Sequence, residues 1–255
     1  MVSGWQGYAL TMQQGFTQLR KLGFSVEKLR DIGTTSISHI TLDTHGEIIG
    51  RTGRERWGVL NCEQKEPKRF NIQLPRQYLR QELLASIPDD IVQWGKKLTS
   101  IDNDKRKVYF SDNSSETYDL LVGADGIWSQ FSLPQYPLTY LGVIVILGRG
   151  RVTMSNDLNL GVDKIWQTVD GVSRMYAMPF GIEGETMWQL SWQCSEKEAK
   201  EFGGQSSLLL AEAKRRVAEW HDPWTELLNS TQEKDVTGVF YVVVNLYVGG
   251  HIVLN

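Results

Sequence analysis

The alternation of apolar and polar residues predicts strands near the start of the chain. Residues 36–50 alternate on both sides of a turn at Asp43–Gly46, a pattern typical of a β-hairpin on a half-buried sheet. Before this hairpin, apolar residues recur at helical spacing, and Gly23 follows them as a candidate C-cap. The sequence therefore predicts a first helix whose apolar face carries Leu10, Met12, Phe16, Leu19 and Leu22.

Helical spacing returns between two prolines in the next part of the chain. Leu79, Leu83 and Ile87 recur one turn apart. Pro75 is tolerated in the first turn of a helix, and Pro88 ends it. This pattern predicts a helix between the two prolines.

Three short strands are predicted next, near residues 91–101, 107–111 and 117–123, with turn-rich runs between them. In the third, residues 120–122 are consecutively apolar. Such a run is expected in a strand that is covered on both faces, as in a parallel sheet. The sequence thus predicts that this segment is buried in a sheet with helices on both sides.

The character of the sequence changes from Leu138. Four strand-like segments rich in Trp, Tyr, Met and β-branched residues predict a second, mostly antiparallel sheet. An amphipathic helix follows, with Ser206 or Ser207 available as its N-cap and Pro223 beyond its end. Large side chains of the sheet either line an apolar substrate pocket or fill the core, the commoner fate of alternating strand residues. They are Trp166, Tyr176, Met178, Trp188 and Trp192.

Charge and composition limit the classes of partner that the chain is expected to bind. The 255 residues carry a formal net charge of -3 and no Lys/Arg cluster, so no nucleic-acid partner is expected and a small molecule is favoured. Cys62 and Cys194 lie far apart and the four histidines are scattered, so neither a disulfide framework nor a metal site is predicted. No apolar run approaches the roughly 18 residues of a membrane span. A cytoplasmic location is the default expectation, an organelle stays open, and the sequence specifies no oligomeric state.

One short motif suggests chemistry. The run YDLLVGADGIWS places Asp125 between glycines at the end of an apolar segment. Glycine lets the backbone come close to a ligand, and open α/β sheets bind ligands at the carboxyl ends of their strands. Asp125 could therefore accept hydrogen bonds from a hydroxyl-rich ligand, or it could simply cap the turn that Gly123 and Gly126 form. The motif does not match the G-x-G-x-x-G pattern, which occurs nowhere in the chain.

This motif resembles the Asp-Gly fingerprint of the class A FAD-dependent monooxygenases, the aromatic hydroxylase-like family. The run PRQYLRQELL resembles the family's Arg-x-x-Leu-x-x-x-Leu helix, with Arg76, Leu79 and Leu83 in the matching places. The run SQFS replaces the family's usual Ser-x-Val-Arg ending, so a basic residue is missing there. The resemblance implies an α/β (mixed α+β) fold, with a partial FAD-binding Rossmann-like domain and a second, mostly antiparallel substrate-domain sheet.

The resemblance also implies a cofactor and a reaction. Arg76, Asp125 and Gly126 are the implied FAD-binding residues, with NAD(P)H as reductant and a small organic, aromatic molecule as a candidate substrate. A complete member would hydroxylate or epoxidise its substrate through a flavin hydroperoxide, so no protein side chain is predicted to be catalytic. From the residues alone, Arg76 could equally be a surface arginine of an amphipathic helix. Arg80, one turn later, has a weaker claim because the family motif does not fix it.

The resemblance suggests how the chain is divided. Residues 1–130 would form part of the FAD-binding domain, with 35–74 crossing into the substrate sheet. Residues 131–235 would form the substrate domain, and 236–255 would return as a strand toward the FAD-binding domain. The family's glycine-rich fingerprint and its later Gly-Asp motif have no counterpart here, so the sequence is expected to be truncated at both ends.

Two other functions stay open at this stage. The chain could be a non-catalytic remnant or interaction protein that no longer holds FAD, as the missing fingerprints suggest. It could also be a flavin reductase or dehydrogenase, since a fold and an Asp-Gly motif do not fix the reaction.

Overall fold

The computed structural model describes residues 9–12, 14–36, 38–53, 71–126, 138–153, 164–181, 184–202 and 204–244. The chain divides into two compact units, Met1–Glu82 with Gly142–Tyr241, and Leu83–Leu141 with Val242–Asn255. The predicted division into FAD-binding and substrate domains stays a prediction.

The helices are α1 (Gly15–Lys21), α2 (Val26–Ile32), α3 (Arg76–Ala85), α4 (Glu196–Glu201), α5 (Ser206–Arg216), α6 (Trp224–Ser230) and the 3-10 turn η1 (Glu233–Asp235). The strands are β1 (Ala9–Thr11), β2 (Thr34–Ser36), β3 (Ser38–Leu42), β4 (Ile48–Gly53), β5 (Asn71–Pro75), β6 (Leu98–Asp102), β7 (Lys107–Phe110), β8 (Ser115–Thr117), β9 (Leu138–Arg151), β10 (Lys164–Val169), β11 (Ser173–Phe180), β12 (Glu185–Gln193) and β13 (Thr237–Val244).

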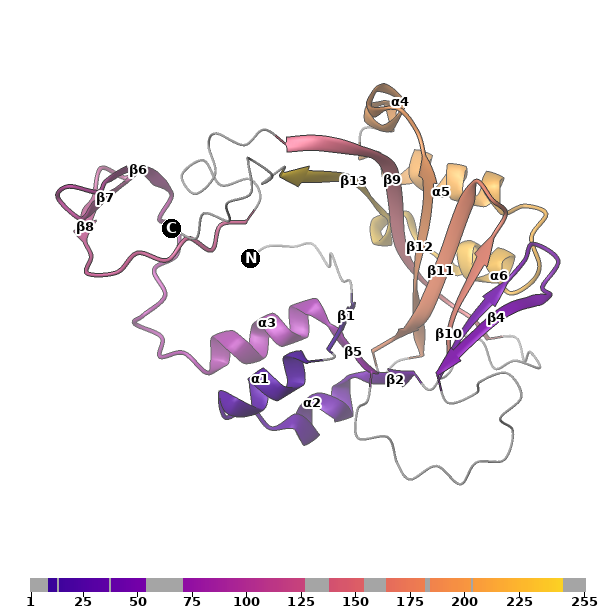
Figure 1. Cartoon of the computed structure of the whole chain (residues 1–255), viewed down its shortest axis with the longest axis horizontal. Coiled ribbons are helices and arrows are strands. Elements are labelled where there is room, and N and C mark those ends of the chain that lie inside the picture. Colours follow the sequence, from indigo (N-terminus) through magenta and orange to yellow (C-terminus); the bar gives the residue numbers. More distant parts are fainter. Residues whose placement is uncertain are drawn as a thin grey trace, which may run out of the picture. The chain divides into compact units, whose positions relative to one another are not determined.

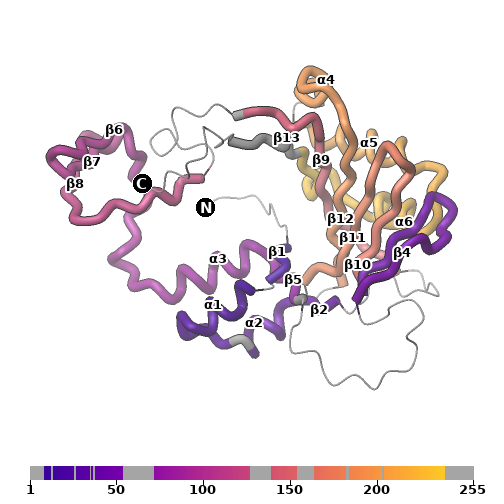
Figure 2. Tube along the Cα trace, in the orientation of Figure 1, coloured from indigo at the N-terminus to yellow at the C-terminus, as the bar shows by residue number. Residues whose placement is uncertain are grey.

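A seven-stranded sheet dominates the first unit, in the order β13-β9-β12-β11-β10-β3-β4. Strands β9, β12, β11 and β10 pair antiparallel, which confirms the predicted mostly antiparallel sheet. The predicted hairpin is also confirmed, because β3 and β4 pair antiparallel. This hairpin joins the sheet through a parallel pairing of β3 with β10, so segments far apart in the sequence lie side by side (Figures 1 and 2).

The hairpin turn is held by one carboxylate. Oδ1 of Asp43 accepts hydrogen bonds from the backbone N–H groups of His45 and Glu47, each at 2.9 Å. These bonds stabilise the ionised carboxylate and hold the pKa of Asp43 below its ordinary value. The local sequence thus specifies the turn that the hydrophobic pattern predicts.

One face of the sheet, called here the helical face, packs against α5 and α6 (Figure 1). Trp166, Trp188 and Trp224 are fully buried there, and Nε1 of Trp188 donates to Oγ1 of Thr231 at 3.0 Å. A Cβ at Gly148 would lie 2.3 Å from the ring of Trp188, so only glycine leaves room for the indole. Trp166, Trp188 and Trp192 therefore belong to the core.

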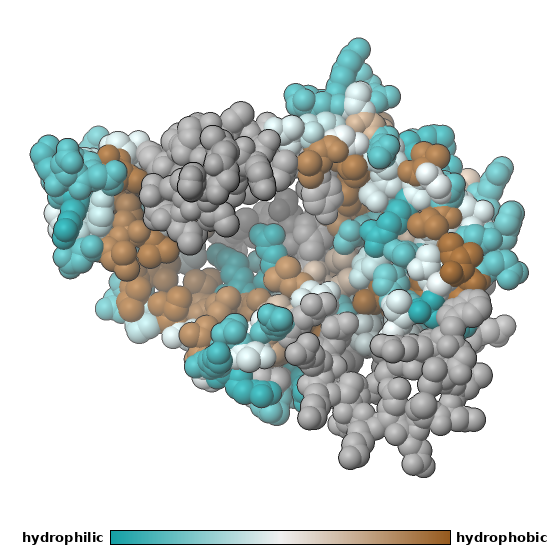
Figure 3. Space-filling view, in the orientation of Figure 1, coloured by the Kyte–Doolittle hydropathy of each residue, from teal (hydrophilic) through white to brown (hydrophobic). Residues whose placement is uncertain are grey.

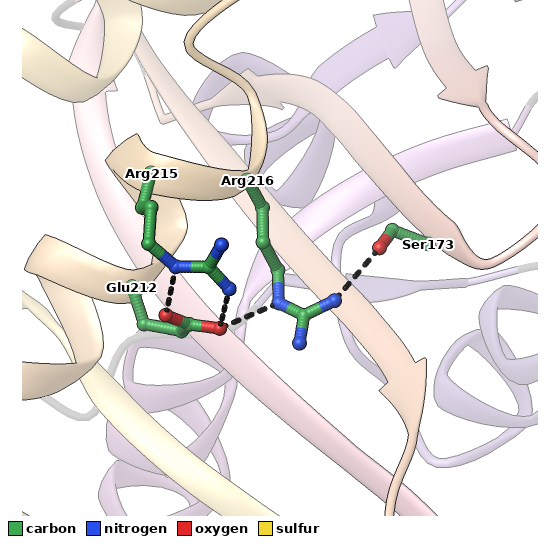
Figure 4. A network of polar contacts seen from close by, with 4 residues as sticks. All are labelled: Ser173, Glu212, Arg215 and Arg216. Carbon is green, nitrogen blue, oxygen red and sulfur yellow. Dashed lines mark hydrogen bonds and ion pairs between the residues drawn. The ribbon is translucent and has the colours of Figure 1, made fainter.

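An ionic network ties α5 to the sheet (Figure 4). The carboxylate of Glu212 accepts from Nε of Arg215 at 2.8 Å and from Nε of Arg216 at 2.8 Å. Arg216 also donates to Oγ of Ser173 at 3.2 Å and lies 3.9 Å above the ring of Trp192. A guanidinium can make these contacts together because it is flat and has several donors.

The predicted serine N-cap of α5 is wrong. Gln205 occupies the N-cap position and its side chain makes no capping bond. Ser206 instead starts the helix, and its Oγ donates to the carbonyl of Val236 at 2.8 Å. The hydroxyl has a long-range partner that local sequence does not reveal.

The predicted first helix begins later than its apolar pattern suggests. Residues 9–11 form β1, which pairs with β5, so Leu10 lies in a strand. The helix α1 starts at Gly15 and buries Phe16 and Leu19. Gly23 has a φ of +88°, which confirms its role at the C-terminal end of the helix.

The helix predicted between Pro75 and Pro88 is confirmed as α3, which buries Leu79. Pro75 is the last residue of β5 rather than a residue of the first helical turn. Ser25 caps the neighbouring helix α2 by accepting from the N–H of Lys28 at 3.2 Å. Lys28 in turn forms an ion pair with Glu82 of α3 at 2.8 Å.

In the second unit, β6, β7 and β8 form a three-stranded antiparallel sheet. The prediction of a buried strand at 117–123 is wrong, because β8 ends at Thr117 and residues 118–126 belong to none of the described sheets. Leu120 and Val122 are 81% and 74% exposed. An apolar run becomes a strand only where neighbours supply backbone partners, and no described strand does so here. The apolar surface is visible beside β6–β8 (Figure 3).

Candidate functional site

Arg76, one of the predicted site residues, is the first residue of α3 and is exposed. It directly follows β5, whose last residue, Pro75, pairs with Ala9 of β1. Within the described part of the chain, its guanidinium has no hydrogen-bond or ion-pair partner. Arg76 therefore keeps its donors available for a ligand.

The strand before Arg76 lies next to the sheet face opposite the helices, called here the opposite face. The N–H of Ala9, the register partner of Pro75, contacts Sδ of Met187 at 3.4 Å. Oγ1 of Thr34 in the neighbouring strand β2 donates to the carbonyl of Pro179 at 2.9 Å. The start of α3 is thus held close to an apolar cluster on the opposite face, which comprises Ile165, Met178, Phe180 and Met187.

Asp125 and Gly126, the other predicted site residues, lie in the second unit and are exposed. Gly126 has a φ of +79°, a conformation that disfavours any residue with a Cβ. The segment is tied at its start, where the N–H of Tyr118 donates to the carbonyl of Arg106 at 2.9 Å. Because Arg76 belongs to the other unit, a shared site of the three residues stays a prediction.

The opposite face carries polar side chains that sequence reasoning did not single out. Nε of Arg174 donates to Oε1 of Gln167 at 2.7 Å, and Nε2 of Gln167 donates to Oγ1 of Thr41 at 2.9 Å. The guanidinium of Arg174 lies 5.0 Å from the centre of the Tyr176 ring. We call Thr41, Gln167, Arg174 and Tyr176 the polar ladder, because three neighbouring strands contribute to it.

His39 extends the polar ladder toward the apolar cluster. Its ring packs edge-on against Tyr176 with 5.7 Å between ring centres. Nε2 of His39 is buried and has no hydrogen-bond partner among the described residues. Burial, followed by the charge of Arg174, lowers the pKa of His39, and burial raises the pKa of Tyr176. Both rings are consequently neutral near pH 7.

A sequence signal for these residues exists. In β3, Ser38, Ile40 and Leu42 are buried, and His39 and Thr41 alternate with them. Period-two alternation therefore assigns His39 and Thr41 to the same face.

The described residues contain neither a group of metal ligands nor a membrane-spanning helix. None of their His, Cys, Asp and Glu side chains form a group of three or more that could bind a metal ion. None of the described helices is long and apolar enough to cross a membrane.

No protein-family model matches the chain. Among curated proteins, FAD-dependent monooxygenase thnD of Trichoderma harzianum is 42% identical over 128 residues, which cover 49% of this chain and 30% of that protein. Monooxygenase penA of Penicillium thymicola is 36% identical over 87 residues, which cover 29% of this chain and 20% of that protein. In sequence, the chain resembles FAD-dependent monooxygenases.

Solved structures of FAD-dependent hydroxylases share the fold. A variant of Klebsiella pneumoniae HpxO complexed with FAD superimposes with a TM-score of 0.74 at 19% identity, over 95% of this chain and 62% of that one. 2,6-Dihydroxypyridine-3-hydroxylase from Arthrobacter nicotinovorans gives 0.72 at 16% identity, over 95% and 63%. The predicted mixed α/β fold of the FAD-dependent monooxygenases is thus confirmed. The chain spans under a third of each curated relative and under two thirds of these two structures.

Proposed function

We propose that this chain forms part of an FAD-dependent monooxygenase that oxygenates a small organic molecule with NAD(P)H as reductant. The observation that carries the proposal is the position of Arg76, an exposed arginine without a partner among the described residues, held beside the apolar cluster by the β1–β5 pairing. The sequence likeness to two monooxygenases supports the same reaction class.

The residues present fit a flavin in part. A guanidinium such as that of Arg76 supplies paired donors for flavin or phosphate oxygens. The carboxylate of Asp125 can accept from ribose or ribityl hydroxyls, and Gly126 lets the backbone approach the cofactor. FAD, when bound, supplies the redox chemistry and oxygen activation. The chain's own residues orient the substrate and exclude water around it.

The opposite face supplies polar groups for the substrate. Its apolar cluster of Ile165, Met178, Phe180 and Met187 is buried, with Ala9 and Tyr176 packed against it. The polar ladder lies beside this cluster and can be reached at the exposed Arg174 and the half-buried Tyr176. A small organic molecule with polar substituents matches these hydrogen-bonding groups. HpxO has been solved in complex with FAD and uric acid.

The test is flavin binding by the full chain. Purified protein is mixed with FAD, and retained flavin absorbance is measured after desalting for the wild type and for Arg76→Ala. Loss of a charge-assisted contact should weaken FAD binding about tenfold. Arg80→Ala on the same helix is the matched control and should retain flavin.

Two further measurements complete the test. Asp125→Ala should also lower flavin retention, and flavin-loaded protein should oxidise NAD(P)H with substrate-dependent oxygen uptake. A folded protein that retains no flavin would contradict the proposal and favour a non-catalytic role. NAD(P)H oxidation without substrate-dependent oxygen uptake would favour a reductase.

A further inference from the structure

The chain contains two Asp-Gly pairs, Asp125–Gly126 and Asp170–Gly171. An aspartate that precedes glycine is prone to cyclise, because glycine has no side chain to keep its amide nitrogen away from the carboxyl carbon. Both glycines have a positive φ, +79° at Gly126 and +87° at Gly171. The two pairs therefore share their sequence and this backbone feature, and they differ in what holds them.

The pair Asp170–Gly171 is held in the turn between β10 and β11. Oδ1 of Asp170 accepts hydrogen bonds from the backbone N–H groups of Val172, at 2.8 Å, and of Ser173. The N–H of Asp170 also donates to the carbonyl of Ser173 at 3.3 Å. Because the strands on both sides of the turn are paired, the carboxylate would have to break these bonds before it could approach the nitrogen of Gly171.

The pair Asp125–Gly126 lies in a segment that no described strand pairs with. Residues 118–126 belong to none of the described sheets, and Tyr118 is the last of them with a backbone hydrogen bond to a described residue. Both residues of the pair are exposed, and a Cβ added to Gly126 would have no atom within 4 Å. The backbone here can therefore change conformation without breaking a described strand pairing.

We infer that Asp125 isomerises spontaneously in the folded protein, through a cyclic imide formed with Gly126. The amide nitrogen of Gly126 attacks Cγ of the protonated carboxyl group. A C–N bond forms, a C–O bond breaks, and the hydroxyl group leaves with the amide proton as water. Water then opens the imide. Cleavage between the nitrogen and Cγ restores aspartate, whereas cleavage between the nitrogen and the backbone carbonyl carbon leaves isoaspartate.

Isoaspartate changes the backbone at the residues proposed to bind FAD. The main chain then runs through the former side chain and gains a methylene group, and the carboxylate moves onto Cα. The contacts proposed for Asp125 and Gly126 would be displaced together, so cofactor binding would decline with the age of the protein. This consequence rests on the proposed function, whereas the reaction at Asp125 does not depend on it.

The reaction is measured on the full chain without flavin, incubated at physiological temperature and neutral pH. Isoaspartate is labelled with an isoaspartyl methyltransferase and assigned by peptide mapping. It should accumulate about tenfold faster at Asp125 than at Asp170, because two backbone hydrogen bonds hold the second carboxylate. In the urea-unfolded chain the two sites should react at similar rates, because no structure distinguishes them.

Three variants identify the reacting group. Asp125→Glu should form almost no isomer at this position, because its cyclisation requires a larger ring. Asp125→Asn should react faster than the wild type, because a neutral amide is attacked more readily than an ionised carboxylate. Asp170→Glu is the matched control and should leave the accumulation at Asp125 unchanged. Far-UV circular dichroism of each variant confirms folding.

Equal accumulation at the two sites in the folded chain would overturn the inference, and so would accumulation at Asp125 only after unfolding. Fresh and aged protein are then mixed with FAD, and retained flavin absorbance is measured after desalting. Flavin loss in proportion to isoaspartate supports the consequence for the cofactor, and full retention by isomerised protein would overturn it. A fresh chain that retains no flavin would contradict the proposed function and leave the measured isomerisation in place.

Discussion

The two faces of the seven-stranded sheet are built from the same strands but carry different chemistry. On the helical face, Trp166 and Trp188 are fully buried, and Trp188 has a hydrogen-bond partner in Thr231. On the opposite face, Tyr176 is half-buried and Arg174 is exposed. Successive residues of β11 and β12 therefore point to different environments, a tryptophan-rich core on one side and a face with exposed polar side chains on the other.

The largest expected effect is on the helical face. Trp188→Ala removes a fully buried indole and leaves a cavity, so the free energy of unfolding should fall by about 3–5 kcal/mol. Tyr176→Ala, one pairing away on the opposite face, is the matched control and should cost clearly less. Urea unfolding of both variants measures the difference. Equal losses would show that the two faces contribute alike to stability.

Gly150→Ala should have the next largest effect. A Cβ there would lie 2.4 Å from the backbone carbonyl of Leu227, so α6 would have to move away from the sheet. Such overpacking costs about 1–3 kcal/mol. The control is Gly50→Ala in β4, where the nearest atom would be 3.5 Å away in Thr41. A stability of Gly150→Ala within error of the control would mean that α6 is not tightly seated.

Removing the charge of Glu212 should have a smaller effect that depends on pH. Hydrogen bonding from Arg215 lowers the pKa of Glu212 below its ordinary value of 4.5. A carboxyl group whose pKa is lowered in the folded state stabilises the fold at pH values above its pKa in the unfolded state. This stabilisation is lost as the pH falls through the pKa of the folded state. Glu212→Gln should therefore lose about 1 kcal/mol at pH 7. The difference should disappear in strongly acidic solution, and a pH-independent difference would argue against an ionic origin.

The smallest expected effect concerns His39 on the opposite face. Its lowered pKa means that the folded protein resists protonation, so stability should fall as pH drops below the ordinary value of 6.5. In His39→Gln this part of the pH dependence should be absent. Arg174→Gln should raise the His39 pKa slightly, since it removes a repelling charge. Imidazole NMR signals report both changes, and an unchanged pKa in Arg174→Gln would show that burial alone sets it.

The sequence predicted those elements whose formation depends mainly on residues close by in the chain. The hairpin β3–β4 and the helix α3 have strong local signals, namely a turn led by Asp43 and leucines one turn apart. The prediction of a buried strand through residues 120–122 failed because a strand requires hydrogen-bonding partners, which a local pattern cannot provide. The prediction of a serine N-cap for α5 failed for a related reason, since the hydrogen-bond partner of Ser206 is 30 residues away in the sequence.

The candidate site was predicted unevenly. Arg76 was predicted through a motif and its role stays a prediction, to which the structure adds the position of α3 beside the apolar cluster. The polar ladder was not predicted, although the alternation of residues in β3 and β11 was sufficient to assign its members in each strand to one face. What alternation cannot supply is register, and only register brings Thr41, Gln167 and Tyr176 into line.

The parallel pairing of β3 with β10 also has a consequence for how the protein folds. The hairpin β3–β4 can form early from local contacts, but its place in the sheet requires a strand much later in the chain, as the 126-residue separation of Thr41 and Gln167 shows. Contacts of such long range form slowly, because chain entropy is lost before they form. The hydrogen bonds that join Thr41, Gln167 and Arg174 should therefore form late in refolding.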